Sequence, residues 1–151
     1  MQRKQICNDY KLIMETNLHK YLLSCGVKPS VQRIAVMKYL MEHRTHPTAD
    51  EIYVALSPSM PTLSKTTVYN TLKLLAAHGA ILLLDLDGRN ARFDGDVSPH
   101  AHFLCRSCGR VFDMPLSVSA ERLQVEREGF EIDEVQVYYK GYCKACNSGK
   151  N

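Results

Sequence analysis

Apolar residues recur at three- and four-residue steps along the first half of the chain, the spacing that gives a helix one buried face. This pattern predicts helices over residues 11–25, 31–43, 48–56 and 64–78. Gly26 and Gly79 follow the first and the last of them, where glycine often ends a helix. Ser30 is an expected N-cap, and Thr48 and Ser64 stand at the expected starts of the other two helices.

A different pattern follows the fourth helix. Residues 81–86 and 91–94 are expected strands on either side of Asp87-Gly88-Arg89-Asn90, which predicts a hairpin with its turn at Asp-Gly. Three short helices, a fourth with outward hydroxyls and cations, and then a hairpin form the order of a winged helix-turn-helix. In such a module the last helix enters the major groove of DNA.

The second half has mixed patterns. We expect strands over residues 101–105 and 110–114, a helix over 116–128 and a strand over 130–142, where apolar residues alternate. The turn formers between Asp94 and Pro99 indicate a domain boundary. The prediction is an α+β fold with a winged helix-turn-helix domain at 1–94 and a small α/β domain at 95–151.

Composition narrows the class. The 151 residues are 45% hydrophobic and 23% charged, as in soluble globular proteins. The longest apolar run, at residues 80–84, is too short to cross a bilayer, and no secretory signal core follows the N-terminus. We therefore expect a cytoplasmic protein. Six cysteines in such a chain favour metal binding over disulfides.

Charge separates the two halves. Residues 1–78 carry 10 Lys and Arg against 5 Asp and Glu, a balance of +5, whereas residues 79–151 carry 9 against 11, a balance of −2. A basic first half suits a polyanionic partner, although chance can produce such a split. The side chains expected to contact phosphates and base edges are Arg33, Ser64, Lys65, Thr66, Thr67, Tyr69, Asn70 and Lys73. The alternative is a solvated polar face on a helical bundle.

Two Cys-x-x-Cys pairs lie in the second half. Cys105 and Cys108 are separated from Cys143 and Cys146 by 34 residues. Four thiolates favour a closed, structural zinc site. A redox dithiol is the alternative, but the setting does not resemble thioredoxin. Cys7 and Cys25 are expected to be free or buried thiols.

A second group of candidate ligands consists of histidines and aspartates, namely His46, Asp94, His100, His102 and Asp113. Each is unremarkable alone, because a histidine before proline is usually a turn residue and an aspartate can cap a strand. As a set, mixed nitrogen and oxygen donors near a domain joint suit Fe(II), Mn(II) or Zn(II). On an extended segment, the two histidines of His-x-His point to one face.

These motifs together resemble the ferric uptake regulator (Fur) superfamily of bacterial metal-dependent repressors over nearly the whole chain. The resemblance rests on His46-Pro47-Thr48-Ala49-Asp50-Glu51-Ile52-Tyr53, Ser64-x-x-Thr67-Val68-Tyr69-Asn70-x-Leu72, Arg92-Phe93-Asp94, His100-x-His102-x-x-Cys105-x-x-Cys108-Gly109 and Cys143-x-x-Cys146.

The resemblance implies a homodimeric repressor that binds an operator in double-stranded DNA and has no membrane partner. It implies structural zinc on the four cysteines and a regulatory Fe(II) or Mn(II) ion held by the histidine and aspartate group at the domain hinge. Lys28 resembles the basic residue that the family places near the minor groove, and Tyr69 resembles a major-groove contact. Metal would favour the closed, DNA-binding dimer.

Within the superfamily the chain is similar to the peroxide-stress repressors. Asp94 and Asp113 match that subfamily, whereas iron sensors usually have glutamate at both positions. In peroxide sensors a ligand histidine, here His46 or His100, is oxidised at the iron. Residues 133–136 lack the histidine of an additional metal site, so we do not expect one.

Two other classes compete with a repressor. Two histidines and a carboxylate can form a non-haem iron oxygenase centre, but the chain has no cofactor motif and five ligands could crowd out a substrate, so we expect no enzyme. A zinc-stabilised interaction module would leave the basic first half unexplained. Iron sensing without peroxide chemistry is the alternative nearest to our prediction.

Overall fold

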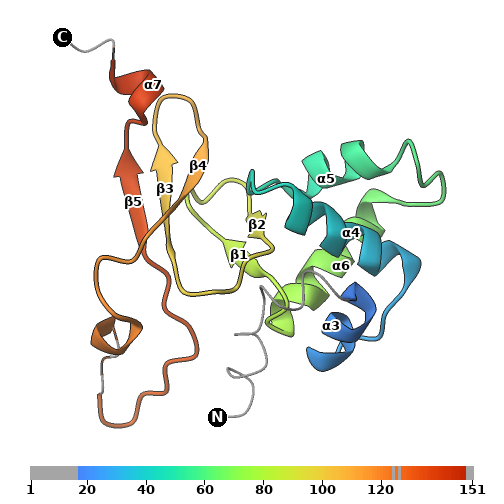
Figure 1. The fold of residues 1–151 in the computed structure, drawn as a ribbon, viewed down its shortest axis with the longest axis horizontal. Helices are drawn as coiled ribbons and strands as arrows, with labels where there is room; N and C mark the ends of the chain where they lie inside the picture. Colours follow the sequence, from blue (N-terminus) through green and yellow to red (C-terminus); the bar gives the residue numbers. More distant parts are fainter. Residues whose placement is uncertain (1–16, 124, 126, 149–151) are drawn as a thin grey trace. The chain divides into compact units, whose positions relative to one another are not determined.

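A computed structural model describes residues 17–123, 125 and 127–148 of the chain (Figure 1). The chain divides between Ser98 and Pro99 into two compact units. This division lies beyond the boundary predicted after Asp94. Residues 95–98 therefore belong to the first unit.

Four helices build most of the first unit (Figure 1), and they are α3 Leu18–Ser24, α4 Val31–Glu42, α5 Ala49–Leu56 and α6 Lys65–Ala77. Local hydrogen bonds fix where the last three begin. Ser30 and Ser64 accept from the third backbone N–H of their helices, and Thr48 forms a capping box with Glu51. The predicted helices are confirmed, although α3 is shorter than expected and residues 11–16 lie outside the described part of the chain.

The helices enclose one apolar core. Leu22, Val36, Ile52 and Leu72, one from each helix, are fully buried in it. The hydroxyl of Tyr21 donates to the Ala80 carbonyl oxygen at 2.9 Å, so the one polar group of that buried ring is satisfied. This core fixes the face that α6 turns toward solvent.

A hairpin follows the helices in the first unit. Strands β1 Leu82–Leu84 and β2 Arg92–Asp94 pair antiparallel, with Leu82 opposite Asp94, and the connecting turn contains Gly88 at φ 69°. This confirms the predicted hairpin. Helices followed by a two-stranded wing give the predicted winged helix-turn-helix.

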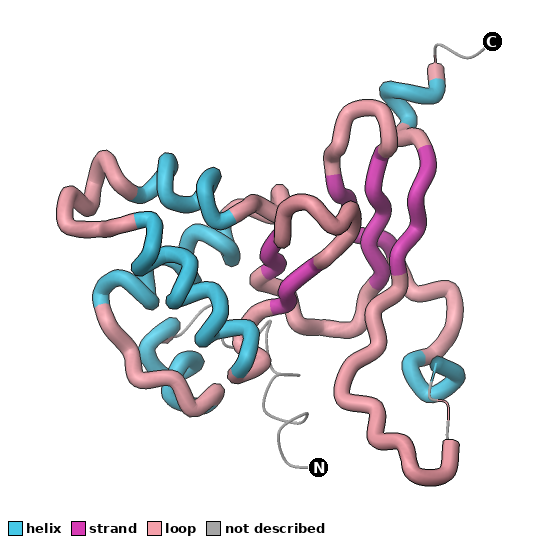
Figure 2. Tube along the Cα trace, turned by 180° about the vertical axis from the view of Figure 1, so that it is seen from behind, coloured by secondary structure: helices cyan, strands magenta, loops and turns pink. Residues whose placement is uncertain are grey.

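The second unit is a three-stranded sheet with short helices (Figure 2). Its strands are β3 Ala101–Cys105, β4 Val111–Met114 and β5 Tyr138–Gly141, in the order β4-β3-β5. β4 is antiparallel and β5 parallel to the central β3. The 3-10 helix η2 (Ala120–Leu123) lies in the connection from β4 to β5, and α7 (Lys144–Asn147) follows β5.

Two predictions for this unit are wrong. Instead of a helix over residues 116–128, the described residues contain only η2, and Val118 and Val125 are 39% and 66% exposed. The apolar spacing there has no packing surface, so it does not produce a long helix. Instead of a strand over residues 130–142, pairing is confined to β5, because Tyr138 already lies opposite His102 near the start of β3. Residues 130–136 run past the end of their partner strand.

The remaining apolar segments are short. Among the described residues, no helix is both long and apolar enough to cross a membrane.

Candidate metal centres and nucleic-acid interface

The four cysteines of the paired motifs gather at one edge of the second unit's sheet. Because β3 and β5 are parallel, their carboxyl ends meet, and Cys105 lies opposite Gly141, two residues before Cys143. Arg106 N–H donates to the Gly141 carbonyl oxygen at 2.7 Å and ties the two segments together. The sulfurs of Cys105, Cys108, Cys143 and Cys146 all lie within 4.8 Å of one another.

The sulfur positions suit a tetrahedral ion. Zinc with Zn–S bonds of about 2.3 Å separates its sulfurs by about 3.8 Å, and the Cys108 and Cys143 sulfurs are 3.9 Å apart. A left-handed Gly109, at φ 69°, lets the first pair turn back toward the sheet. The second pair lies at the start of α7, where Cys146 N–H donates to the Cys143 carbonyl oxygen.

The thiols of this cluster differ in acidity. Backbone N–H groups of Cys108 and Cys143 donate to the Cys105 sulfur and lower the pKa of that thiol to about 6. The Ser107 hydroxyl favours the thiolate of Cys146, but hydrogen bonding with the neighbouring thiols, Cys143 foremost, and burial outweigh it and raise the pKa of Cys146 to about 11. Crowded sulfurs therefore resist full ionisation until a cation compensates their charge.

A second cluster lies toward the start of β3, away from the cysteines. His102 is opposite Asp113 across the β3–β4 pair, and His100 lies two residues earlier, on the same side of the chain. The Nε2 atoms of His100 and His102 are 3.0 Å apart, and Asp113 Oδ1 is 3.3 Å from the first and 3.8 Å from the second. His102 is 2% exposed.

The distances between these donor atoms match those between ligands of one metal ion. Donors about 2.1 Å from one ion are separated by about 3.0 Å at octahedral and about 3.4 Å at tetrahedral angles. The donors of His100, His102 and Asp113 thus form one face of a coordination sphere. Three protein ligands leave the sphere incomplete.

The first unit holds two further predicted ligands together. His46 and Asp94 are 2% and 4% exposed, and His46 Nε2 lies 3.5 Å from Asp94 Oδ2. The other carboxylate oxygen of Asp94 accepts from Asp96 N–H at 2.8 Å. β2 brings the pair together, since Phe93 N–H donates to the Pro47 carbonyl oxygen and Arg92 donates to that of His46.

Backbone constraints hold this pair in place. His46 has φ 53°, a left-handed conformation that is uncommon outside glycine and is enriched at functional sites. Gly95 lies against α4, and a β-carbon there would lie 3.1 Å from the Leu40 carbonyl atoms. The segment that carries Asp94 therefore has no room for a side chain at residue 95.

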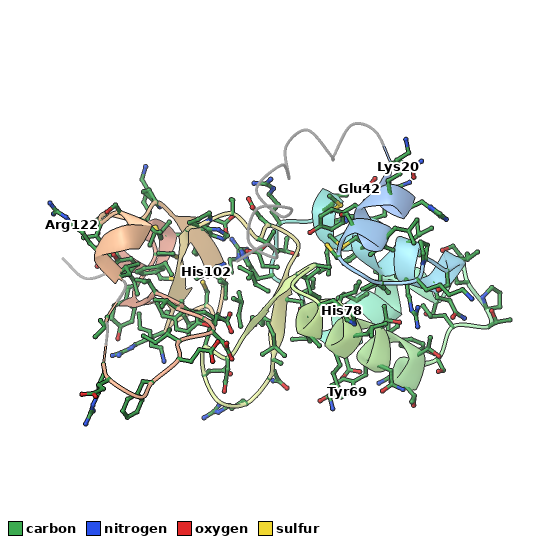
Figure 3. All side chains as sticks on the ribbon, turned by 90° about the horizontal axis from the view of Figure 1, so that it is seen from below. Lys20, Glu42, Tyr69, His78, His102 and Arg122 are labelled. Atoms are coloured by element: carbon green, nitrogen blue, oxygen red, sulfur yellow. The ribbon has the colours of Figure 1, made fainter. Side chains whose placement is uncertain are left out.

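The exposed face of α6 carries most of the predicted DNA contacts. Lys65, Thr66, Tyr69, Asn70 and Lys73 are all exposed, whereas Val68, Thr71, Leu72 and Leu75 face the core. Tyr69 projects from the helix (Figure 3), and its ring lies 4.8 Å from the Lys73 ammonium. The face offers cations, hydroxyls, an amide and an aromatic ring.

Three predicted contacts have local partners. The Ser64 hydroxyl caps α6 by accepting from Thr67 N–H, and it lies 2.8 Å from the Thr67 hydroxyl. Arg33 donates to the Lys28 carbonyl oxygen at 2.6 Å and holds the turn that presents Lys28. The position of Ser64 at a helix start was expected from the sequence, whereas the supporting contacts of Arg33 and of the Thr67 hydroxyl were not.

Sequence reasoning missed Asp50 as part of this face. Its Oδ1 atom lies 3.0 Å from the Lys65 ammonium, and Ala49, Asp50, Lys65, Thr66 and Tyr69 line a hollow of about 260 Å³ between α5 and α6. Asp50 lies in the first turn of α5, where acidic residues are common. Its pairing depends on helix packing, for which the sequence carries no local signal.

The sequence is similar to those of known proteins over most of its length. The profile of the Ferric uptake regulator family matches residues 24–140. The peroxide-responsive repressor PerR of Staphylococcus aureus is 37% identical over 127 residues, covering 83% of this chain and 86% of the relative.

Solved structures agree with this similarity. The ferric uptake regulator of Pseudomonas aeruginosa with manganese has a TM-score of 0.66 and 25% identity, covering 85% of this chain and 99% of that one. The Campylobacter jejuni peroxide stress regulator has a TM-score of 0.64 and 27% identity, covering 85% and 96% respectively. These proteins are regulators, which agrees with our expectation that the chain is not an enzyme.

Proposed function

Because the chain belongs to the ferric uptake regulator family, we propose that it is a homodimeric repressor whose DNA binding depends on a regulatory Fe(II) or Mn(II) ion and which senses peroxide. One observation carries the proposal. Mixed nitrogen and oxygen donors converge at His100, His102 and Asp113, in the same unit as a separate cluster of four thiols. A chain with one thiolate cluster and one open donor cluster is equipped for a permanent ion and an exchangeable one.

The regulatory ion would draw ligands from both domains, 1–94 and 95–151. His46 and Asp94 form an incomplete donor pair in the first, and His100, His102 and Asp113 form an incomplete donor face in the second. Neither group alone fills a coordination sphere, whereas five donors with a mixture of imidazole and carboxylate suit Fe(II) or Mn(II). An ion shared in this way would favour one arrangement of the domains over all others.

The DNA surface would consist of α6 and the turn before α4. Tyr69, Asn70 and Thr66 have the chemistry for base edges, while Lys28, Lys65 and Lys73 supply phosphate contacts. Arg33, Ser64 and Thr67 support these groups through the bonds described above and remain within reach of a backbone phosphate. The partner is thus duplex DNA, with one recognition helix for each half-site of a dimer.

Exposed apolar groups support a dimer. Phe130, Ile132 and Val135 are 65%, 48% and 50% exposed, and they precede β5, an edge strand of the described sheet. Exposed apolar residues beside an open strand edge are typical of a surface that pairs with a second chain. Zinc on Cys105, Cys108, Cys143 and Cys146 would stabilise this small domain.

The ligand types and the similarity to two peroxide regulators support the proposal of peroxide sensing. Bound iron would supply the redox chemistry. One oxygen atom of the peroxide is inserted at a ring carbon of His46 or His100 and the other leaves as water, which balances the reaction. An oxidised imidazole is a poorer ligand, so metal and then DNA would be released. Iron sensing without this chemistry is the alternative.

The deciding experiment has two readouts. Duplexes selected from a random pool in the presence of Mn(II) should bind roughly 5- to 150-fold more tightly with the metal than without it, and the affinity should fall steeply with salt. Metal-independent binding would contradict the gating. After aerobic Fe(II) and peroxide, mass spectrometry should find a gain of ~16 Da, one oxygen atom, on His46 or His100. Unmodified histidines with retained DNA binding would favour iron sensing.

A further inference from the structure

The hollow between α5 and α6 combines opposite charges on the proposed DNA surface. Asp50 Oδ1 pairs with the Lys65 ammonium at 3.0 Å, and the same ammonium lies 5.8 Å from the centre of the Tyr53 ring. Thr66 and Tyr69 complete the lining. A carboxylate here is unexpected on a surface that binds DNA, because the other side chains that line the hollow are either positively charged or uncharged.

Helix capping does not explain this carboxylate. The neighbouring residue Glu51 forms the capping box, in which its carboxylate accepts a hydrogen bond from Thr48 N–H at 2.7 Å. Asp50 and Lys65 side chains remain 75% and 64% exposed, and an ion pair of that exposure stabilises a fold little. Asp50 therefore contributes little to the stability of the fold, and its main effect is on which groups can bind in the hollow.

A carboxylate beside a bound duplex has two effects. It repels the phosphates and competes with them for Lys65, which weakens binding to any sequence. It also accepts hydrogen bonds, and the major groove presents donors only where cytosine or adenine places its exocyclic amino group. A duplex with an amino group at the hollow recovers part of the lost affinity, and other duplexes do not.

We propose that Asp50 is a specificity-determining residue that accepts a hydrogen bond from an exocyclic amino group of one base and disfavours duplexes lacking it. This inference rests on the proposed DNA binding of α6 and adds a requirement at one base position. Lys65 is then the paired positioning residue, which holds the carboxylate in the free protein and takes a phosphate in the complex.

The test compares Asp50→Ala with Glu42→Ala. Glu42 forms an exposed ion pair with Lys38 at 3.7 Å, so both substitutions remove one negative charge and one exposed pair. Glu42 lies on the other side of the helical unit from Tyr69 (Figure 3). Full-length, metal-loaded proteins are titrated with a random-sequence duplex and with the best duplex selected by the unsubstituted protein, and selection is repeated with each variant.

Asp50→Ala should bind the random duplex about 3- to 10-fold more tightly than Glu42→Ala does. The ratio of selected to random affinity should fall about tenfold, and one position of the selected site should lose its preference for a base with an amino group. Equal affinities for the two variants, or tighter binding with every base preference retained, overturns the proposal.

Folding and the wider function are checked separately. Thermal unfolding should show a cooperative transition for both variants. If Asp50→Ala does not fold, Asp50→Leu replaces it, because leucine also lacks both the charge and the hydrogen-bond acceptors. If the Asp50 variant binds both duplexes more weakly than the unsubstituted protein does, Asp50 has a supporting role and the inference is overturned. If the unsubstituted protein binds no duplex, the proposed function itself fails.

Discussion

Two groups of metal-ligand donors lie toward opposite ends of strand β3 in the second unit, and they differ in how they are built. The four thiols come from two short turns joined by the β3–β5 pair, and all four belong to one unit. The proposed ligands of the regulatory ion, which we call the divided cluster, come from both units: His100, His102 and Asp113 belong to the second and His46 and Asp94 to the first. One cluster is locally complete and the other is not.

This difference has a thermodynamic meaning. An ion in a complete cluster stabilises the unit that holds it, because the ligands are ordered by the same contacts that order the sheet. An ion that needs both groups must also hold the two units in one arrangement, so part of its binding free energy depends on that arrangement. Such an ion binds more weakly and exchanges more readily, so the occupancy of its site can change with conditions in the cell.

Breaking the complete cluster should have the largest effect. Cys143→Ser removes a ligand just before α7. We expect zinc content to fall from about one ion per chain to near zero and the dimer to be lost, because binding of structural zinc is worth about 10–16 kcal/mol. Elemental analysis and light scattering after size exclusion measure both. Cys25→Ser, at a partly buried thiol outside the cluster, is the control. A zinc-free variant that remains a folded dimer would show that the zinc is not structural.

Breaking the divided cluster should leave the fold intact. His100→Ala removes one donor of the β3 group, and the Kd for Mn(II) should rise at least roughly 10- to 100-fold while zinc stays bound. Calorimetry with Mn(II) and elemental analysis for zinc separate the two effects. His43→Ala is a suitable control, since His43 is exposed and stacks on Tyr39. Loss of zinc in the His100 variant would contradict the independence of the two clusters.

The sequence predicts features that short-range contacts decide. The starts of three helices were predictable because Ser30, Thr48 and Ser64 bond within their own first turns. The hairpin was predictable from its Asp-Gly turn. The cysteine pairs also carry their spacing in the sequence, although only the parallel β3–β5 pairing brings them to one edge.

Features that depend on a partner segment were not predictable. The alternating residues 130–136 read as a strand, but β3 is too short to pair with them. The ion pair of Asp50 with Lys65 was also not predictable, because it exists only where α5 packs on α6. Tertiary packing decides each of these outcomes.

The smallest expected effect comes from a substitution that tests how precisely the first unit holds Asp94. In Gly95→Ala, the added methyl group would lie 3.1 Å from Leu40 backbone atoms, so the segment must shift and carry Asp94 with it. We expect about tenfold weaker Mn(II) binding, or ~1.4 kcal/mol, with unchanged zinc, as measured by calorimetry and elemental analysis. Gly141→Ala is the matched control, because its methyl group would make ordinary contact, 3.4 Å from the Phe103 ring. Equal Mn(II) affinity in both variants would mean that Asp94 either adjusts to the shift or does not bind the ion, and Asp94→Ala distinguishes these two cases.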